Sequence, residues 1–136
     1  MNRVRLHSEL IRDEANRLKP YRDSVGKLTI GIGRNLDDRG ISKEESFFLF
    51  KNDLNRVEAE ALSVFPQFPN FSNSRQRALI NMLFNLGLSR FLGFKRMIAA
   101  IHNNDWGKAA DEALDSRAAR QTGERYSRIA KLLREG

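Results

Sequence analysis

One short stretch of this chain alternates with the period of a β-strand, within a sequence whose other segments have helical periodicity. The stretch runs through Leu28, Thr29, Ile30, Gly31, Ile32 and Gly33. Its alternation predicts a strand with one apolar face and one nearly bare face that carries a hydroxyl group. Glycines on a strand let a ligand approach closely, so the bare face is a candidate floor of a cleft. We expect a small β-meander over residues 17–36, with Arg17 to Tyr21 as a further strand.

Helices are predicted on both sides of this meander, which makes the chain α+β and mainly α. Ser42 and Glu45 form a capping box at the start of a long helix that ends before Pro66. Trp106 begins a later helix. We interpret it as a residue that anchors the apolar core, in preference to one on which a sugar stacks. The expected helices cover about residues 2–16, 43–64, 94–103, 106–116 and 123 onward. One more helix is expected to begin after Ser72 or Ser74, either of which can cap it. Asp37 to Gly40 predicts a turn.

The length and composition are those of a single domain. With 136 residues the chain is long enough for one apolar core and too short for two independent domains. It has no cysteine, and His7 and His102 are too far apart in sequence to suggest a metal site. No cofactor motif is present, so we expect neither a cofactor nor a metal. A monomer is expected because the apolar stripe of the long helix is used for the core.

Two carboxyl groups precede the predicted strand in different surroundings. Glu14 falls within an apolar arc of the first helix that includes Val4 and Leu10, and apolar neighbours favour the protonated form of a carboxyl group. Asp23 opens the sequence Asp-Ser-Val-Gly, which predicts a solvated turn with Gly26 at positive φ. A proton donor and an ionised carboxylate in contrasting environments are typical of glycosidic bond hydrolysis. Glu14 is the candidate acid and Asp23 the candidate base.

The spacing of these residues resembles the catalytic signature of the T-even phage lysozymes, glycoside hydrolase family 24. That signature is Glu, eight residues, Asp, five residues and Thr, followed by Ile-Gly-Ile-Gly. In this chain it is filled by Glu14, Asp23, Thr29 and Ile30 to Gly33. Further segments are similar to family segments in the same order: Ile41 to Asp53, Ala78 to Phe84, and Ser116 to Arg125. The likeness therefore runs along nearly the whole chain.

The resemblance implies a lysozyme-like fold of two lobes joined by a long helix. A lobe with a small antiparallel β-sheet is expected over about residues 14–42, and the joining helix over about residues 43–64. The helical lobe is expected over about residues 72–136 together with helix 2–13. The whole chain, residues 1–136, is then one lysozyme domain.

The implied activity is that of a phage endolysin for host cell lysis. It hydrolyses the β-1,4 bond between N-acetylmuramic acid and N-acetylglucosamine in the glycan strands of peptidoglycan. By the resemblance, Glu14 protonates the leaving oxygen, Asp23 is the base or electrostatic partner, and Thr29 helps to hold the attacking water. The expected outcome is inversion at the anomeric carbon.

Candidate substrate contacts are Gly33 on the strand and Asn85, Arg117 and Arg125 in the C-terminal half. Asn81 and Asn85 are polar residues of an otherwise apolar helix, so each is either hydrogen-bonded inside or faces a cleft. We favour the internal role for Asn81 and leave both open for Asn85. Arg125 matches a family position near the catalytic Glu, and from the sequence it is equally an exposed charge.

One position departs from the family pattern. Family members often have His after the Gly-Ile-Gly strand, where this chain has Arg34. An ion pair from Arg34 to the matching acid, Asp53, would be permanent instead of titrating near neutral pH.

Most of the net charge of +7 lies in the C-terminal part of the chain. Residues 1–72 hold 12 Lys and Arg against 11 acids, and residues 73–136 hold 12 against 6. A basic face attracts polyanions, so a basic helical nucleic-acid-binding protein is an alternative class. It does not account for the Glu, Asp, Thr order, and no nucleic-acid motif accompanies the arginines, so we expect no nucleic-acid partner. A lytic transglycosylase, the other alternative, would need only Glu14, and the presence of Asp23 and Thr29 favours hydrolysis.

The sequence has no apolar run of membrane-spanning length, and the N-terminus lacks the apolar core of a signal peptide. We therefore expect a protein without a signal peptide that is made in the host cytoplasm. It would reach the cell wall after release through a membrane pore.

Overall fold

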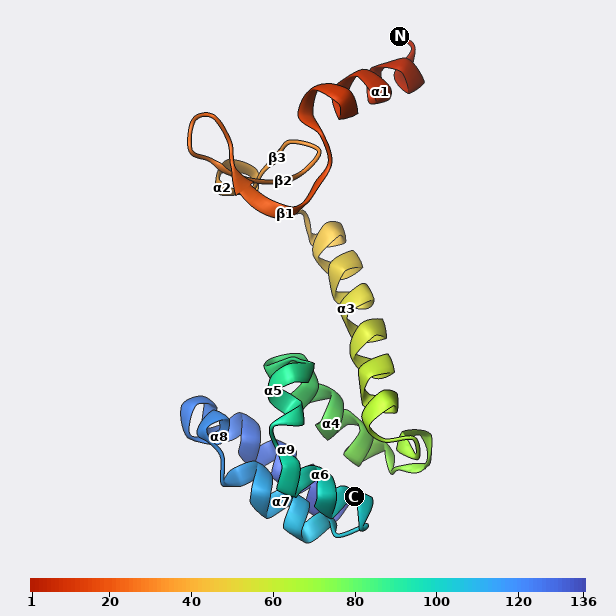
Figure 1. The fold of residues 1–136 in the computed structure, drawn as a ribbon, viewed down its shortest axis with the longest axis vertical. Helices are drawn as coiled ribbons and strands as arrows, with labels where there is room; N and C mark the ends of the chain where they lie inside the picture. Colours follow the sequence, from red (N-terminus) through yellow and green to blue (C-terminus); the bar gives the residue numbers. More distant parts are fainter. The chain divides into compact units, whose positions relative to one another are not determined.

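The computed structural model describes residues 1–136, which form two compact units. Unit 1 is Met1–Leu49 and unit 2 is Phe50–Gly136 (Figure 1). The boundary falls within the long helix α3, Lys43–Val64. The mainly helical α+β class predicted from the sequence is confirmed.

Unit 1 contains one helix, a three-stranded sheet and a one-turn helix before α3 begins. These elements are α1 (Arg3–Glu14), β1 (Arg17–Arg22), β2 (Leu28–Gly31), β3 (Arg34–Asn35) and α2 (Leu36–Arg39). The sheet has the order β1-β2-β3 and both strand pairs are antiparallel. Thr29 stands in its middle, with Tyr21 and Asn35 as its partners on the two neighbouring strands. The predicted meander over residues 17–36 is confirmed.

The strand predicted over residues 28–33 is shorter than expected. β2 ends at Gly31, and Ile32 and Gly33 form the turn to β3. Gly31 and Gly33 have φ of +67° and +68°, which L-residues rarely adopt. The glycines therefore reverse the chain instead of extending the bare face of the strand.

One segment of unit 1 differs in detail from the expectation. In the predicted turn Asp37 to Gly40, residues 37–39 belong to α2 and Gly40 is its C-cap, because the side chain of Asn35 caps the start of this short helix by accepting from the N–H of Asp38 at 2.9 Å. The capping box before α3 is confirmed. Ser42 Oγ accepts from the N–H of Glu45 at 3.1 Å, and Glu45 Oε1 accepts from the N–H of Ser42 at 2.8 Å.

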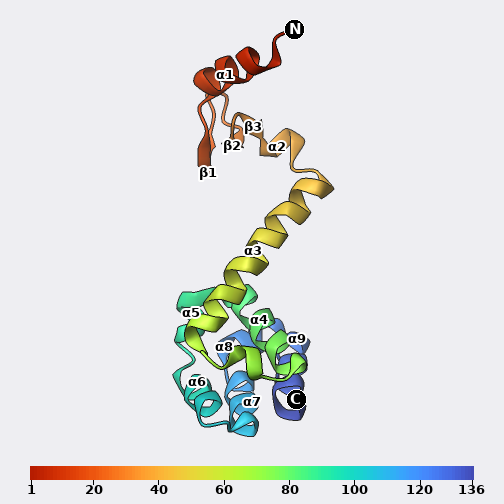
Figure 2. The same ribbon diagram turned by 90° about the vertical axis from the view of Figure 1, so that its right-hand side faces the viewer.

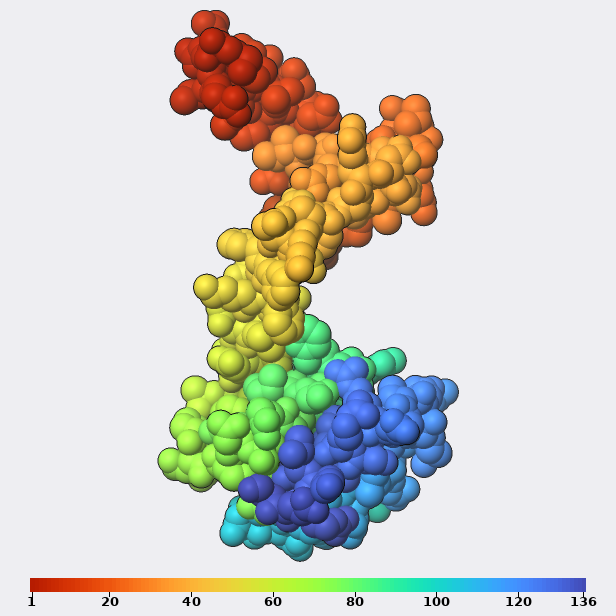
Figure 3. All heavy atoms as spheres, turned by 180° about the vertical axis from the view of Figure 1, so that it is seen from behind, coloured from red at the N-terminus to blue at the C-terminus, as the bar shows by residue number.

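Unit 2 holds the apolar core. After α3 come η1 (Phe68–Asn70), α4 (Asn73–Leu86), α5 (Leu88–Leu92), α6 (Lys95–His102), α7 (Trp106–Leu114), α8 (Arg117–Thr122) and α9 (Glu124–Glu135). Helix α9 packs on α4 and α7, and α7 packs on α6 (Figure 2). The fully buried side chains include Phe65, Leu79, Met82, Phe91, Tyr126 and Leu133. In the space-filling view the green and blue segments of unit 2 lie against one another (Figure 3).

Trp106 is buried, as predicted for a core anchor. The residue is 7 % exposed, and its ring meets Phe71 edge-on at 4.9 Å between ring centroids and carries the Arg75 guanidinium above its face. Its indole N–H donates to Asn104 Oδ1 at 2.8 Å. The short helices α5 and α8 were not predicted. A helix of five or six residues has too few positions to show a periodic pattern.

Candidate active site

Glu14 is the last residue of α1, and its carboxylate lies beside the turn between β2 and β3. The helix ends here because Ala15 adopts φ +62°, with its N–H donating to the carbonyl of Ile11 at 2.8 Å. A Cβ atom placed on Gly33 would lie 2.8 Å from Glu14 Oε2 and 3.0 Å from its Cδ. The bare α-carbon of Gly33 therefore gives the carboxyl group the room to reach the sheet.

Within unit 1, no apolar surface covers the arc of α1 that holds Glu14. Helix α1 has no buried residue, and the Glu14 side chain is itself exposed. Val4 is 78 % exposed and Leu10 is 45 % exposed. The helical period does place these residues on one arc with Glu14, but an arc becomes an apolar environment only when another apolar surface covers it. The three short strands of unit 1 do not provide that surface.

Asp23 lies in the hairpin turn between β1 and β2, as predicted. Its Oδ1 accepts from the N–H of Val25 at 3.0 Å and from the N–H of Lys27 at 2.8 Å. Gly26 has φ +86°, and its N–H donates to the carbonyl of Asp23 at 3.0 Å. The half-buried carboxylate is thus fixed through one oxygen by two backbone donors. Its Oδ2 has no partner within the protein.

Thr29 is the buried polar residue of the sheet, at 3 % exposure. Its hydroxyl donates to the carbonyl of Lys27 at 2.9 Å. Because the hydroxyl proton is used in this bond, Oγ1 is left with acceptor capacity only. A buried acceptor of this kind suits a single ordered water better than it suits a sugar hydroxyl in an open cleft.

The peptide groups of Lys27 join Asp23 to Thr29. Besides accepting from the Thr29 hydroxyl, the Lys27 carbonyl accepts from the N–H of Asp23 at 2.9 Å. The Lys27 N–H in turn donates to the Asp23 carboxylate. The two predicted site residues are therefore held through one shared residue, which sequence analysis did not single out. Nothing in the sequence marks it, since only its backbone takes part.

Two acids of α2 also hold the hairpin and were not predicted to do so. Asp37 Oδ2 accepts from the N–H of Leu28 at 2.8 Å, and Asp38 Oδ1 accepts from Lys27 Nζ at 3.1 Å. The hydrogen bond from Lys27 lowers the pKa of the Asp38 carboxyl group, and Asp38 raises the pKa of Lys27. The Asp37-Asp38 pair was the available signal in the sequence, and it was predicted only as part of a turn.

Arg34 pairs with an acid other than the predicted Asp53. Arg34 Nη1 donates to Glu45 Oε1 at 2.8 Å, and Asp53 instead accepts from Arg56 at 2.8 Å. Arg34 Nη1 also donates to the carbonyl of Gly40 at 3.1 Å. The hydrogen bond from Arg34, with further donors from Ser42, lowers the pKa of Glu45 to about 2.

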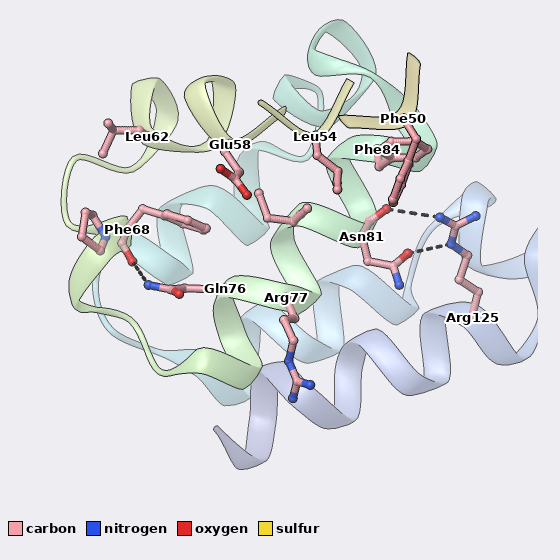
Figure 4. A pocket seen from close by; sticks show the side chains of 12 residues that line it. Phe50, Leu54, Glu58, Leu62, Phe68, Gln76, Arg77, Asn81, Phe84 and Arg125 are labelled. Atoms are coloured by element: carbon pink, nitrogen blue, oxygen red, sulfur yellow. Dashed lines mark hydrogen bonds between the residues drawn. The ribbon is translucent and has the colours of Figure 1, made fainter. Parts of the chain in front are cut away.

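Arg125 lies in unit 2 and is held by Asn81. Its Nε donates to Asn81 Oδ1 at 2.8 Å, and its Nη2 donates to the Asn81 carbonyl at 3.4 Å (Figure 4). Both residues line a cavity of about 700 Å³ whose walls include Leu54 and Phe84. Asn81 is thus hydrogen-bonded within the protein, although it is exposed and not in the core. Arg125 is half-buried with a fixed guanidinium.

Asn85 and Arg117 have different surroundings within unit 2. Asn85 is half-buried, and its Oδ1 accepts from the hydroxyl of Tyr126 at 3.1 Å. Tyr126 is fully buried, and this burial raises its pKa. Arg117 is exposed at the start of α8 and belongs to none of the ion pairs of the unit. Of the seven predicted site residues, unit 1 holds Glu14, Asp23, Thr29 and Gly33, and unit 2 holds Asn85, Arg117 and Arg125.

The fold and these residues define a class of protein: a mainly helical α+β chain whose small sheet unit carries an exposed acid, a turn carboxylate and a buried hydroxyl group. The chain matches the model of the phage lysozyme family over residues 12–132. It belongs to this family and is a glycosidase-type enzyme. The family predicted from the order of Glu14, Asp23 and Thr29 is confirmed.

Relatives from several sources support this assignment. The probable T4-type lysozyme 1 of Dictyostelium discoideum is 30% identical, over 91% of this chain and 90% of that protein. The endolysin of Salmonella phage P22 is 34% identical, over 79% of this chain and 77% of that protein. The pre-baseplate central spike protein Gp5 of Enterobacteria phage T4 is 32% identical over 93% of this chain, which corresponds to 27% of that longer protein.

Proposed function

We propose that this protein is an endolysin-type muramidase. It hydrolyses the β-1,4 bond between N-acetylmuramic acid and N-acetylglucosamine in the glycan strands of peptidoglycan. The observation that carries the proposal is the contact of the Glu14 carboxylate with Gly33, in the same unit as Asp23 and Thr29. Membership of the phage lysozyme family supports the same chemistry.

Glu14 is the proposed general acid. Its carboxyl group is exposed at the end of a helix, where a polysaccharide can reach it. A bound polysaccharide would bring its glycosidic oxygen within hydrogen-bonding reach of this carboxyl group. The proton then passes to the leaving glycosidic oxygen as the bond breaks.

Asp23 is the proposed base or electrostatic partner. Backbone donors engage its Oδ1 and leave Oδ2 free to accept a proton from the attacking water or to face the positive charge that develops on the sugar. Thr29 is proposed to hold that water. Since Thr29 Oγ1 can only accept, a water bound to it donates one hydrogen and keeps a lone pair for the anomeric carbon.

Attack by a held water on the face opposite the leaving group gives inversion. Such a mechanism needs room for the water, with the two carboxyl groups roughly 6.5–9.5 Å apart. A retaining enzyme would instead use Asp23 as a nucleophile at closer range. We propose the inverting route, in which Thr29 holds the water that attacks the anomeric carbon directly.

The same proposal includes substrate binding by four further residues, Gly33, Asn85, Arg117 and Arg125. It also groups helix 2–13 with the helical lobe. Arg125 supports substrate binding best, because a guanidinium fixed in place by Asn81 loses little freedom when it binds an anionic or polar ligand.

No helix of the structure combines the length and the apolar character needed to cross a bilayer. Release to the cell wall through a pore made by another protein is a further part of the proposed role in host lysis.

The decisive experiment compares wild type with Glu14→Gln on outer-membrane-permeabilised cells. We expect wild type to clear the suspension and the variant to lose at least about 100-fold in rate, the usual contribution of a general acid. Glu9→Gln, on the same helix, is the matched control because Glu9 is paired to Arg5 at 3.5 Å and has no proposed role. Equal clearing by Glu14→Gln and wild type would refute the assignment.

The products separate hydrolysis from the transglycosylase reaction. Mass spectrometry should find reducing muramic acid ends with one added water per cut. Products with 1,6-anhydro ends would show that no water attacks, and would refute the roles given to Asp23 and Thr29.

A further inference from the structure

The one-turn helix α2 contacts β2, and two of its side chains bind residues 27 and 28 of the hairpin. Asp38 Oδ1 accepts from Lys27 Nζ at 3.1 Å, and Asp37 Oδ2 accepts from the N–H of Leu28 at 2.8 Å. The two acids therefore hold neighbouring residues, one through a side chain and the other through the backbone. We call Asp37 and Asp38, with these two bonds, the α2 clamp.

The clamp closes a ring of contacts that begins and ends at Thr29. Thr29 is paired with Asn35 on the neighbouring strand β3. The Asn35 side chain holds Asp38 at two points, because its Oδ1 accepts from the N–H of Asp38 and its Nδ2 donates to Asp38 Oδ2, each at 2.9 Å. Asp38 accepts from the Lys27 ammonium, and the Lys27 carbonyl accepts from the Thr29 hydroxyl. A closed ring of this kind restricts the positions that the Thr29 hydroxyl can take.

One peptide group connects the clamp to the proposed catalytic residues. The Lys27 carbonyl and the Leu28 N–H are the two ends of the same planar peptide bond. Its oxygen accepts from the hydroxyl of Thr29 and from the N–H of Asp23, and its N–H donates to Asp37. Because the peptide plane is rigid, a rotation that breaks the bond to Asp37 also turns the carbonyl away from Thr29. Asp37 therefore helps to fix the direction in which the Thr29 hydroxyl donates its proton.

The side-chain bond of the clamp is an exposed ion pair. The hydrogen bond from Lys27 lowers the pKa of Asp38, and the hydrogen bond to Asp38 raises the pKa of Lys27, so both groups are ionised at neutral pH. The two side chains are 43 % and 54 % exposed. Ion pairs this exposed contribute little to global stability, so removal of the pair should leave the chain folded and change the local geometry.

We propose that Asp37 and Asp38 are positioning residues for the attack of water on the glycosidic bond. In this role they act through the peptide group between Lys27 and Leu28, and not by contact with the sugar. While the Lys27 carbonyl is fixed, it keeps the proton of the Thr29 hydroxyl, and Oγ1 presents its acceptor lone pairs to the water. The inference rests on the proposed function, in which this water attacks the anomeric carbon.

Steady-state kinetics of the full-length protein on soluble glycan fragments of peptidoglycan test the clamp. Asp37→Ala and Asp38→Ala should each lower kcat about three- to tenfold and leave KM within about twofold of wild type, because the clamp orients the water and does not bind sugar. Asp37→Asn is the conservative variant. It loses the 3.9 Å ion pair to Arg22 but can still accept from the N–H of Leu28, so it should keep at least about half of the wild-type kcat.

A double-mutant cycle tests the path through Lys27. Lys27→Met keeps the backbone groups and removes the ammonium group, so Lys27→Met/Asp38→Ala should be no slower than Lys27→Met alone. Losses that multiply in the double variant would overturn the path from Asp38 through this side chain. Asp111→Ala is the matched control, because it removes another exposed acid with an ion-pair partner, Arg134, on α7 of unit 2. Circular dichroism melts verify that each variant is folded at the assay temperature.

Amide hydrogen exchange gives a readout that does not depend on catalysis. The N–H groups of Asp23 and Lys27 should exchange about three- to tenfold faster in Asp38→Ala than in wild type, while those of α4 should not change. An active wild type with unchanged kcat in both alanine variants, or an equal loss in Asp111→Ala, would overturn the clamp alone. A wild type that cleaves no wall would refute the muramidase proposal, and the exchange rates would then decide whether α2 holds the hairpin.

Discussion

The carboxylate of Glu14 lies against the bare α-carbon of Gly33, with Oε2 2.8 Å from the position that a side chain would take. Residues 19 positions apart in sequence are joined here by the end of a helix and the tip of a hairpin. Real side-chain carbons essentially never approach other atoms this closely, so any other residue at this position would push the carboxyl group away. Gly33 is thereby a positioning residue for the proposed acid.

The variant Gly33→Ala tests this relationship. It should lower cell-wall hydrolysis strongly, because the new methyl group displaces the Glu14 carboxylate. Its backbone cost is roughly 1–2 kcal/mol, from the left-handed φ of +68°. Gly31→Ala is a matched control with φ +67° and no atom within 4 Å of the added carbon. Similar loss of activity in both variants, at similar melting temperatures, would contradict a specific effect on Glu14.

Asp23→Asn should separate the charge of this residue from its structural role. An asparagine oxygen still accepts from the N–H groups of Val25 and Lys27, so the turn should keep its stability. Activity should fall because the base is gone. Asp23→Ala loses both hydrogen bonds and should be destabilised by about 1–2 kcal/mol in addition. Thermal melts and wall hydrolysis measured on both variants give the comparison, and an active Asp23→Asn would exclude catalysis by this carboxylate.

The ion pair of Arg34 with Glu45 makes stability depend on acid pH. The folded-state pKa of Glu45, about 2, lies below its ordinary value of 4.5. Its contribution to stability is therefore complete above about pH 4.5 and is lost as the pH falls toward 2. Melting temperatures measured over this range should fall for wild type and fall less steeply for Arg34→Ala.

Arg34→His should make the stability of the fold depend on pH in the neutral range. A histidine beside Glu45 gains a partner only when protonated, so the carboxylate should raise the pKa of the imidazole. The resulting stabilisation would be complete below about pH 6.5 and would be lost as the pH rises through the raised value. Melts at about pH 5 and about pH 9 should differ more in this variant than in wild type. Equal differences in the two proteins would contradict a pairing with Glu45.

Asn81 and Arg125 should behave as a coupled pair. Removing either side chain breaks the hydrogen bonds between them, so the cost of the double variant Asn81→Ala/Arg125→Ala should be less than the sum of the single costs by about 0.5–1 kcal/mol. Urea unfolding of the four proteins measures this difference. A cycle with Asn81→Ala and Arg77→Ala is the comparison, because no hydrogen bond joins those residues. Additive costs in the first cycle would contradict the pairing.

Much of the fold could be predicted from local patterns. The capping box of Ser42 and Glu45 and the hairpin turn at Asp23 depend on residues near one another in sequence. The environment of Glu14 could not be predicted this way. An apolar arc shows which residues can be buried, whereas burial depends on the surface that another part of the chain presents.

The ion-pair partners of charged residues also could not be predicted from the sequence. Several acids follow Arg34 in the sequence, and each could have been its partner. Arg34 pairs with Glu45 and not with Asp53 because of the turn at Gly40, whose carbonyl accepts from the same nitrogen atom of Arg34. Asp37 and Asp38 bind the hairpin because the one-turn helix α2 points them at it. The family resemblance identified Glu14, Asp23 and Thr29, but it gave no sign of the Lys27 peptide groups that connect two of them.

All the buried apolar side chains belong to unit 2, and in unit 1 the buried side chain is Thr29. Local opening should therefore be unequal along the chain. Amide protons of α4, α7 and α9 should exchange with deuterium last, near the rate of global unfolding. Those of the sheet, which is held mainly by hydrogen bonds and partly exposed ion pairs, should exchange early and faster still in concentrated salt. The segment proposed to carry out the chemistry is then also the one that moves most readily.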